Sequence, residues 1–197
     1  MKDSVILVDA DGVLLNWSYA FDVWMSQHGF EQIPGGELDY AMEARYGVSQ
    51  EQIFKLIKIF NESAAIGFLP PLRDAIHYVK KLHDEHGYVF HCITSVSSEP
   101  NAMKLREMNL AKLFGDTVFE KVICLPTGAD KDDALKPYET TGCYWVEDLP
   151  KNAITGANLG LRSLLMEHGH NMHHYHDHVR TVKNWEEIYR IVTQTSL

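Results

Sequence analysis

The sequence predicts an α/β fold in which helices cover both faces of a parallel β-sheet and a small helical cap follows the first strand. First, the apolar run at 5–8 has the composition of a strand that is buried on both faces. Second, later strand-like runs alternate with helix-like segments, as in βαβ units with right-handed crossovers. Third, residues 16–69 separate the first strand from the second, and a structureless loop of that length is uncommon in a compact domain.

The later elements follow this alternation along the chain. After the first strand, further strands are expected at 88–93, 121–125, 143–146 and 162–166. Helices are expected at 72–86, 100–108, 131–138 and 151–158. Because a helix separates successive strands, we expect parallel strands whose carboxyl ends lie at one edge of the sheet.

The long segment between the first two strands has mostly helical periodicity, for example at 19–25 and 52–57. We therefore expect two units: a core formed by 1–15 and 70–197, and a helical cap formed by 16–69. A small lobe above the carboxyl edge of the sheet could close over a substrate and exclude water.

Composition limits the classes of function. The chain has 197 residues, of which 45% are hydrophobic and 23% charged, and its net charge is −9. This charge argues against a broad basic surface for duplex nucleic acid. A small phosphorylated metabolite remains a suitable partner, because a metal and local cations can neutralise it. The sequence gives no indication of oligomeric state.

Cysteine usage and hydropathy indicate the compartment. Cys92, Cys124 and Cys143 lie in or beside apolar strand-like runs without CxxC spacing, so we expect small buried thiols rather than disulfides or zinc ligands. No apolar stretch reaches 18 residues, and the N-terminus leads directly into a strand. A soluble cytoplasmic protein with no membrane span and no signal peptide is expected.

Two aspartates, Asp9 and Asp11, follow the first strand and precede Gly12. In open α/β sheets, ligands bind at the carboxyl ends of strands. Paired carboxylates there can hold Mg²⁺, and one of them can attack phosphorus to form an aspartyl-phosphate. The alternative is an ordinary strand-to-turn junction, since Asp is common in turns.

Chemically capable side chains also end the later strands. Thr94 and Ser95 form a hydroxyl pair that can hydrogen-bond a phosphate oxygen. Lys131 begins a helix, where the helix dipole favours acids, so its position suggests that it faces an anion. Another acid pair, Glu147 and Asp148, ends the strand at 143–146.

In this order (acid pair, hydroxyl, lysine, acid pair) the chain resembles the haloacid dehalogenase-like (HAD) superfamily of phosphohydrolases, whose four signatures would span residues 9–148. The resemblance implies a Rossmann-like core and a Mg²⁺-dependent phosphomonoesterase. It makes Asp9 the nucleophile and a Mg²⁺ ligand. It makes Asp11 the general acid and base and also a residue of the metal site, although its side chain need not be a ligand.

The resemblance also assigns the remaining site residues. Thr94, with Ser95 beside it, would bind the transferring phosphoryl group, and Lys131 would balance its charge. Lys136 is a rival for the lysine, because Lys136-Pro137 also resembles a form of that signature. Asp148 would complete the metal site, with Glu147 helping directly or through water. The family often has a further acid where this chain has Asn152.

The segments 9–17, 68–75 and 182–188 look like the 5'(3')-deoxyribonucleotidase branch, which implies a deoxynucleoside monophosphate as substrate and places Trp17 near the base. The spacing of the lysine signature looks more like the 3'-phosphatase part of polynucleotide kinases. A sugar phosphate, a 3'-phosphate end and a non-catalytic phosphate-binding module therefore stay open as alternatives.

Six histidines lie between His168 and His178. Clustered imidazoles can bind Zn²⁺ or Ni²⁺, but nothing in this run fixes a ligand count. We expect a surface loop that binds metal adventitiously or not at all. Because the loop leaves from the carboxyl edge, the hypothesis that one histidine contacts substrate stays open.

Overall fold

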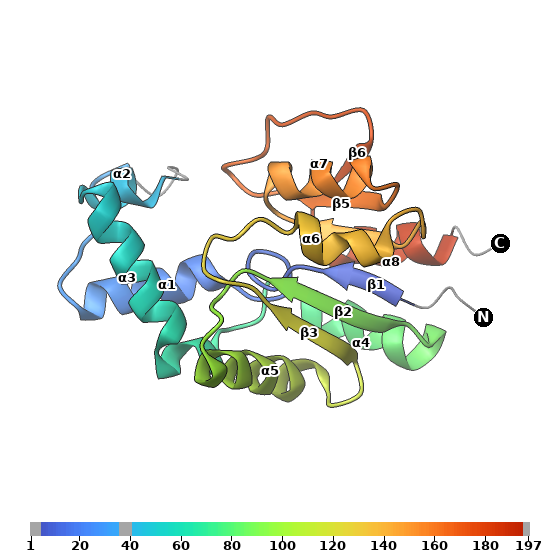
Figure 1. Cartoon of the computed structure of the whole chain (residues 1–197), viewed down its shortest axis with the longest axis horizontal. Coiled ribbons are helices and arrows are strands. Elements are labelled where there is room, and N and C mark those ends of the chain that lie inside the picture. The colour runs from blue at the N-terminus through green and yellow to red at the C-terminus, as the bar shows by residue number, and fades with distance from the viewer. Residues whose placement is uncertain (1–4, 36–40, 195–197) are drawn as a thin grey trace.

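The computed structural model describes residues 5–35 and 41–194 (Figure 1). Within these ranges, six parallel strands form one sheet in the order β3-β2-β1-β4-β5-β6, which confirms the predicted α/β fold. The strands are β1 Val5–Val8, β2 Val89–Thr94, β3 Phe119–Cys124, β4 Tyr144–Glu147, β5 Arg162–Met166 and β6 Val179–Val182.

Helices cover both faces of this sheet. One side of β1 contributes Ile6 and Val8 to the larger apolar core, where α4 and α8 pack. The other side contributes Leu7 to a smaller core with Leu135 of α6. The helical elements are α1 Trp17–Gln27, α2 Met42–Tyr46, α3 Gln50–Glu62, η2 Ala64–Phe68, α4 Ala75–His86, α5 Pro100–Phe114, α6 Asp132–Leu135, η3 Lys136–Tyr138, α7 Pro150–Asn158 and α8 Trp185–Gln194.

Some element boundaries differ from those expected. The α5 helix continues to Phe114, six residues beyond the expected end at 108. The expected helix at 131–138 is one α-helical turn followed by the 3₁₀ turn η3, because Pro137 has no N–H to continue the helical bonding. Strand β6 is an addition at the sheet edge: it has only four residues, two of them exposed.

Helices α1, α2 and α3 lie together beyond the carboxyl ends of the strands (Figure 1). Aromatic rings hold them to each other. Phe21 stacks on Trp17 with ring centroids 4.7 Å apart and meets Phe60 and Tyr46 edge-on. The expected boundary between a core and a cap stays a prediction.

Helix α8 is hydrogen-bonded to the turn that follows β1. Trp185 is fully buried, and its indole N–H donates to the Val13 carbonyl at 2.8 Å. Asp74 accepts hydrogen bonds from the backbone N–H groups of Trp185 and Glu186 and so caps α8. Residues 13 and 185 are therefore held together although strands β2 to β6 lie between them in sequence.

The structure also bears on the expected free cysteines and on the expected lack of a membrane-spanning helix. The three cysteines form no disulfide, and Cys92 is fully buried. Over the described ranges, no helix combines the length and the apolar character needed to cross a membrane.

Candidate active site

The turn after β1 brings Asp9 to the carboxyl edge of the sheet. The backbone N–H of Asp9 donates to the Val146 carbonyl, so this residue still belongs to the hydrogen-bonded ladder. Gly12 has φ +73°, and a Cβ built on it would lie 2.1 Å from Asp148 Oδ2. Only glycine allows the two acidic turns to approach this closely.

Lys131 lies between two acids in the buried centre of this edge. Its Nζ is 2.8 Å from Asp9 Oδ2 and 2.8 Å from Glu147 Oε2, and the residue is 2% exposed. Burial alone would lower the pKa of Lys131, but the charges of Asp9 and Glu147 outweigh it and raise the pKa above the ordinary lysine value. The lysine therefore provides a permanent positive charge at the site.

Lys136, the rival lysine of the sequence, lies elsewhere. It is exposed and pairs with Asp133 at 2.6 Å on the surface of α6 and η3. Of the two lysines, the structure brings only Lys131 to the acidic strand ends.

Three carboxylates converge beside Lys131. One oxygen each from Asp9, Glu147 and Asp148 lies within 4.8 Å of the others. Burial, followed by repulsion from Glu147 and Asp9, raises the pKa of Asp148 well above the ordinary aspartate value. Hard oxygen donors that repel one another in a buried place are a donor set suited to Mg²⁺.

The two acids at the end of β4 differ in their other contacts. Glu147 Oε2 accepts from Lys131, and Glu147 Oε1 accepts from the backbone N–H groups of Asp148 and Leu149 at 3.2 and 3.1 Å. Both carboxylate oxygens of Glu147 therefore already accept hydrogen bonds from other groups of the site. Asp148 is the better placed of the pair to offer an oxygen to a metal.

Asp11 is outside the acidic cluster, and its carboxylate faces an arginine. Arg106 Nη1 donates to Oδ1 at 2.7 Å and Nη2 donates to Oδ2 at 2.9 Å. The Arg106 side chain is 0% exposed, whereas that of Asp11 is 25% exposed. Burial, together with nearby Asp9, raises the pKa of Asp11 by more than Arg106 lowers it.

Sequence reasoning missed Arg106, although its position carries a signal. Ala102 and Leu110, four residues before and after it, are buried on the same face of α5. An arginine in the middle of an apolar helical stripe requires a buried acidic partner.

The two hydroxyls that follow β2 have different environments. Thr94 is fully buried, and its Oγ1 has no hydrogen-bond partner among the residues that the structure describes. Ser95 Oγ donates to the Ala129 carbonyl at 2.8 Å and so ties this turn to the loop before Lys131. An unpaired buried hydroxyl is costly unless a ligand completes it, and this makes Thr94 the better candidate to bind a phosphate oxygen.

Trp17 is engaged in packing between helices. Its indole N–H donates to Asn61 Oδ1 at 2.9 Å, and Asn61 Nδ2 donates to the Val96 carbonyl at 2.9 Å. This chain of bonds joins α1 to α3 and to the loop after β2. The contact between Trp17 and a nucleobase stays a prediction.

The histidine-rich loop braces the two acidic turns. His168 Nε2–H donates to the Gly12 carbonyl at 2.7 Å. Asn171 is 2% exposed, and its Nδ2 donates to the carbonyls of Asp148 and Met166 at 2.7 and 2.8 Å. Among the described residues, the group of three or more metal-type ligands is the acidic one and includes no histidine.

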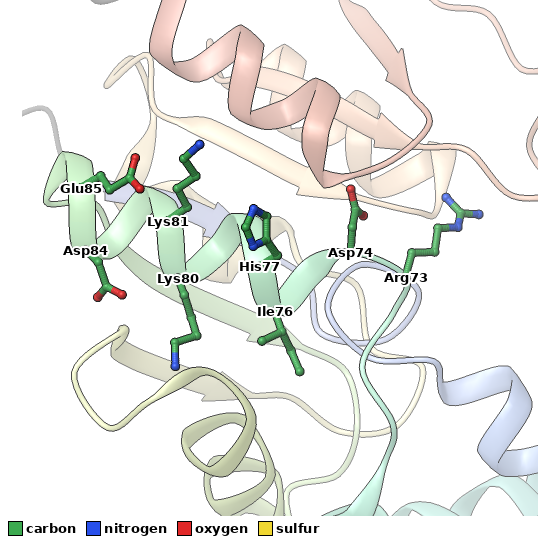
Figure 2. Close-up of a pocket in the computed structure, with 8 residues that line it drawn as sticks. All are labelled: Arg73, Asp74, Ile76, His77, Lys80, Lys81, Asp84 and Glu85. Carbon is green, nitrogen blue, oxygen red and sulfur yellow. The ribbon is translucent and has the colours of Figure 1, made fainter.

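A second depression lies along the outer surface of α4, and its lining includes none of the clustered acids Asp9, Glu147 and Asp148. Figure 2 shows acidic and basic side chains interspersed along this helix. Arg73 donates to the Glu167 carbonyl at 3.0 Å and Asp74 caps α8, so both have structural partners. Its lining residues are Arg73, Asp74, Ile76, His77, Lys80, Lys81, Asp84 and Glu85.

Comparison with known proteins identifies the type of fold. No protein-family model matches the chain. A protein of Enterobacteria phage T4, the uncharacterized 32.4 kDa protein in the Gp30-rIII intergenic region, is 26% identical over 154 residues. The match covers 73% of this chain and 53% of the phage protein, so the chain spans about half the length of that relative.

Solved structures of HAD-superfamily hydrolases share the fold of this chain. The haloacid dehalogenase-like hydrolase SP0104 from Streptococcus pneumoniae has a TM-score of 0.65 at 15% identity, covering 96% of this chain and 99% of that one. CbbY from Rhodobacter sphaeroides, in complex with phosphate, has a TM-score of 0.60 at 17% identity, covering 94% and 96%. At these identities the likeness shows a common HAD-like fold.

Proposed function

We propose that the protein is a Mg²⁺-dependent phosphomonoesterase that works through an aspartyl-phosphate intermediate. The observation that carries the proposal is the convergence of Asp9, Lys131, Glu147 and Asp148 at one edge of the sheet. The phosphate bound to the fold neighbour CbbY supports the same reaction class. Phosphoryl transfer requires mainly positioning and neutralisation of charge, and these side chains provide both.

In the first step, an Asp9 oxygen forms a bond to phosphorus while the bond from phosphorus to the ester oxygen breaks. Asp11 gives a proton to the departing oxygen. Thr94 Oγ1 and the Lys131 ammonium hold the phosphoryl oxygens, whose negative charge Lys131 offsets. In the second step, Asp11 takes a proton from water as the water oxygen attacks phosphorus, which frees Asp9 and releases inorganic phosphate.

Asp9 and Asp148 would hold the metal, with Glu147 acting directly or through water. When bound, Mg²⁺ supplies additional positive charge to the phosphoryl group. The oxygens of the acidic cluster fit this ion because Mg²⁺ prefers a few hard oxygen ligands and keeps several waters.

Among small phosphate esters, we infer a deoxynucleoside monophosphate as the best single candidate. Helices α1 to α3 lie beyond the carboxyl ends of the strands, where they would act as the cap proposed for 16–69 and select the part of the substrate that leaves (Figure 1). Trp17 would lie near the base. A sugar phosphate and a 3'-phosphate end are the other substrates to compare.

A phosphate-release assay tests the proposal. Purified protein with Mg²⁺ should release phosphate from p-nitrophenyl phosphate and faster from at least one member of a panel of nucleotides, sugar phosphates and 3'-phosphorylated oligonucleotides. Chelation of the metal should abolish release, and so should Asp9→Asn. Binding of inorganic phosphate in calorimetry without release from any ester would instead favour the non-catalytic module.

A further inference from the structure

We propose that Arg106 is a positioning residue that aims the carboxylate of Asp11 at the oxygen whose proton it transfers. This inference rests on the proposed phosphatase function. It assigns a role to a fully buried arginine of a core helix that none of the four signatures contains.

The contact fixes the plane of the carboxylate. Both terminal nitrogens of Arg106 donate to Asp11, one to each oxygen, at 2.7 and 2.9 Å. Such a two-pronged contact restrains rotation of the carboxyl group, whereas a single hydrogen bond does not. Each oxygen of Asp11 keeps a second lone pair, so the carboxylate can still exchange a proton with the ester oxygen or with water.

Asp11 needs this restraint because it lies beyond the regular strand. Asp9 is still paired through its backbone with β4, but β1 itself ends at Val8 and the chain turns at Gly12. Outside the sheet, Asp11 makes an isolated β-bridge to Leu15, which holds its backbone but does not fix the plane of its carboxylate. Its contact with Arg106 comes from α5, a rigid element on which a positioning group is held accurately.

A contribution to folding stability does not by itself explain a buried arginine at position 106. Arg106 Nε has no hydrogen-bond partner within residues 5–35 and 41–194, and the neighbouring positions Ala102 and Leu110 are apolar. Replacing a buried ion pair with apolar residues is often neutral or stabilising. A role in orienting the Asp11 carboxylate accounts for the buried ion pair between Arg106 and Asp11.

A neighbour on the same helix offers a matched control. Asn109 is also buried, and its Nδ2 donates to the Leu69 carbonyl at 3.1 Å without contacting any of the four signatures. Asn109→Ala therefore perturbs the packing of α5 but not the contact with Asp11. A purely structural role for Arg106 would give the same kinetic pattern as this control.

The test compares two esters whose leaving oxygens differ in basicity. Proton transfer to the leaving oxygen matters more for glycerol 2-phosphate than for p-nitrophenyl phosphate, and it typically contributes about 10²–10⁴-fold. In Arg106→Lys, kcat for the glycerol ester should fall at least about tenfold more than kcat for the aryl ester, with KM nearly constant. Asn109→Ala should leave the ratio of the two rates unchanged.

A double-variant cycle checks that the effect passes through Asp11. In an Asp11→Asn background, Arg106→Lys should change kcat by less than about twofold, because the group that it orients is already disabled. Equal losses for both esters, or full additivity in the cycle, would overturn the proposal. Arg106→Gln replaces the lysine variant if that protein does not fold.

A crystal structure gives a readout that does not depend on turnover. In Arg106→Gln the Asp11 carboxylate should rotate or occupy several orientations, whereas Asp9 and Lys131 should keep their contact. An Asp11 carboxylate that keeps its orientation would refute the positioning role. Absence of phosphate release by the wild-type protein would refute the proposed function separately.

Discussion

Lys131 Nζ lies 2.8 Å from Asp9 Oδ2, so a cation from the start of α6 meets an acid from the end of β1 in the buried centre of the site. Glu147 accepts a hydrogen bond from the same ammonium group. With Asp148 in the cluster, three acids surround a single lysine, and their negative charge exceeds its positive charge. The stability of the metal-free protein should therefore depend on Lys131 and on how many of these acids are ionised.

Replacing Lys131 with methionine should both destabilise the protein and abolish phosphate release. The change leaves Asp9 and Glu147 buried without their cation, and breaking a buried ion pair from one side costs about 3–5 kcal/mol. Urea unfolding measures the loss. Lys136→Met is the control, because Lys136 is exposed and forms its ion pair with the surface acid Asp133. Equal effects of the two changes would contradict the prediction.

Asp9→Asn should separate catalysis from folding. The amide relieves the repulsion on Glu147 and Asp148, but it also removes one of the two acids that pair with Lys131. The two effects oppose each other, so the metal-free variant should stay folded with little net change in its thermal midpoint. Phosphate release should fall at least about a thousandfold, because an amide is a poor nucleophile. Near-native turnover in this variant would rule out Asp9 as the nucleophile.

The metal-free protein should lose stability as the pH rises. Asp148 has a raised pKa in the folded state, so above the unfolded value of about 3.9 the folded chain keeps a proton that the unfolded chain releases. Its contribution to stability therefore falls as the pH rises through the folded pKa. Mg²⁺ should replace the proton, so its stabilising effect should be largest at high pH.

Urea unfolding with and without Mg²⁺, between about pH 5 and about pH 8, measures this behaviour. Asp148→Asn should flatten the dependence on pH and reduce the effect of Mg²⁺. Asp130→Asn is the control, because Asp130 is exposed and pairs with Lys151 on the surface. A metal-free Asp148→Asn protein as sensitive to pH as the wild type would count against the prediction.

Asn171→Ala should weaken metal binding although Asn171 is not itself an acid of the cluster. Its amide holds the Asp148 carbonyl, and its Oδ1 accepts from the backbone N–H of His168. Losing such a supporting contact typically lowers metal affinity about 10–100-fold, which calorimetry with Mg²⁺ would measure. The exposed neighbour His174 gives the control, His174→Ala, which should bind Mg²⁺ normally.

The sequence predicts the strands of the sheet best where they are buried on both faces. The bounds of β1 agree fully with the expected 5–8, because its four residues form a continuous apolar run. Those of β5 agree with 162–166, where the last three residues are apolar and buried. The edge strand β6 has the sequence Val-Arg-Thr-Val, which is too short and too polar for that pattern. Its position depends on pairing with β5, which no local pattern specifies.

The same distinction applies to the site. The proximity of Asp9, Lys131 and Asp148 could be predicted from the sequence, because the carboxyl ends of parallel strands share one edge. The contacts that support these residues could not be predicted. Arg106 lies within a helix and Asn171 within a polar loop, and their partners are fixed only by how α5 and the loop after β5 pack.

The indole of Trp185 also couples α8 to the acidic turn after β1. The Val13 carbonyl that it holds belongs to the turn carrying Asp11 and Gly12, although α8 lies far along the chain from that turn. Undocking of α8 removes the bond that secures this turn beside β1. Local opening of α8 and mobility of the acidic turn should therefore occur together.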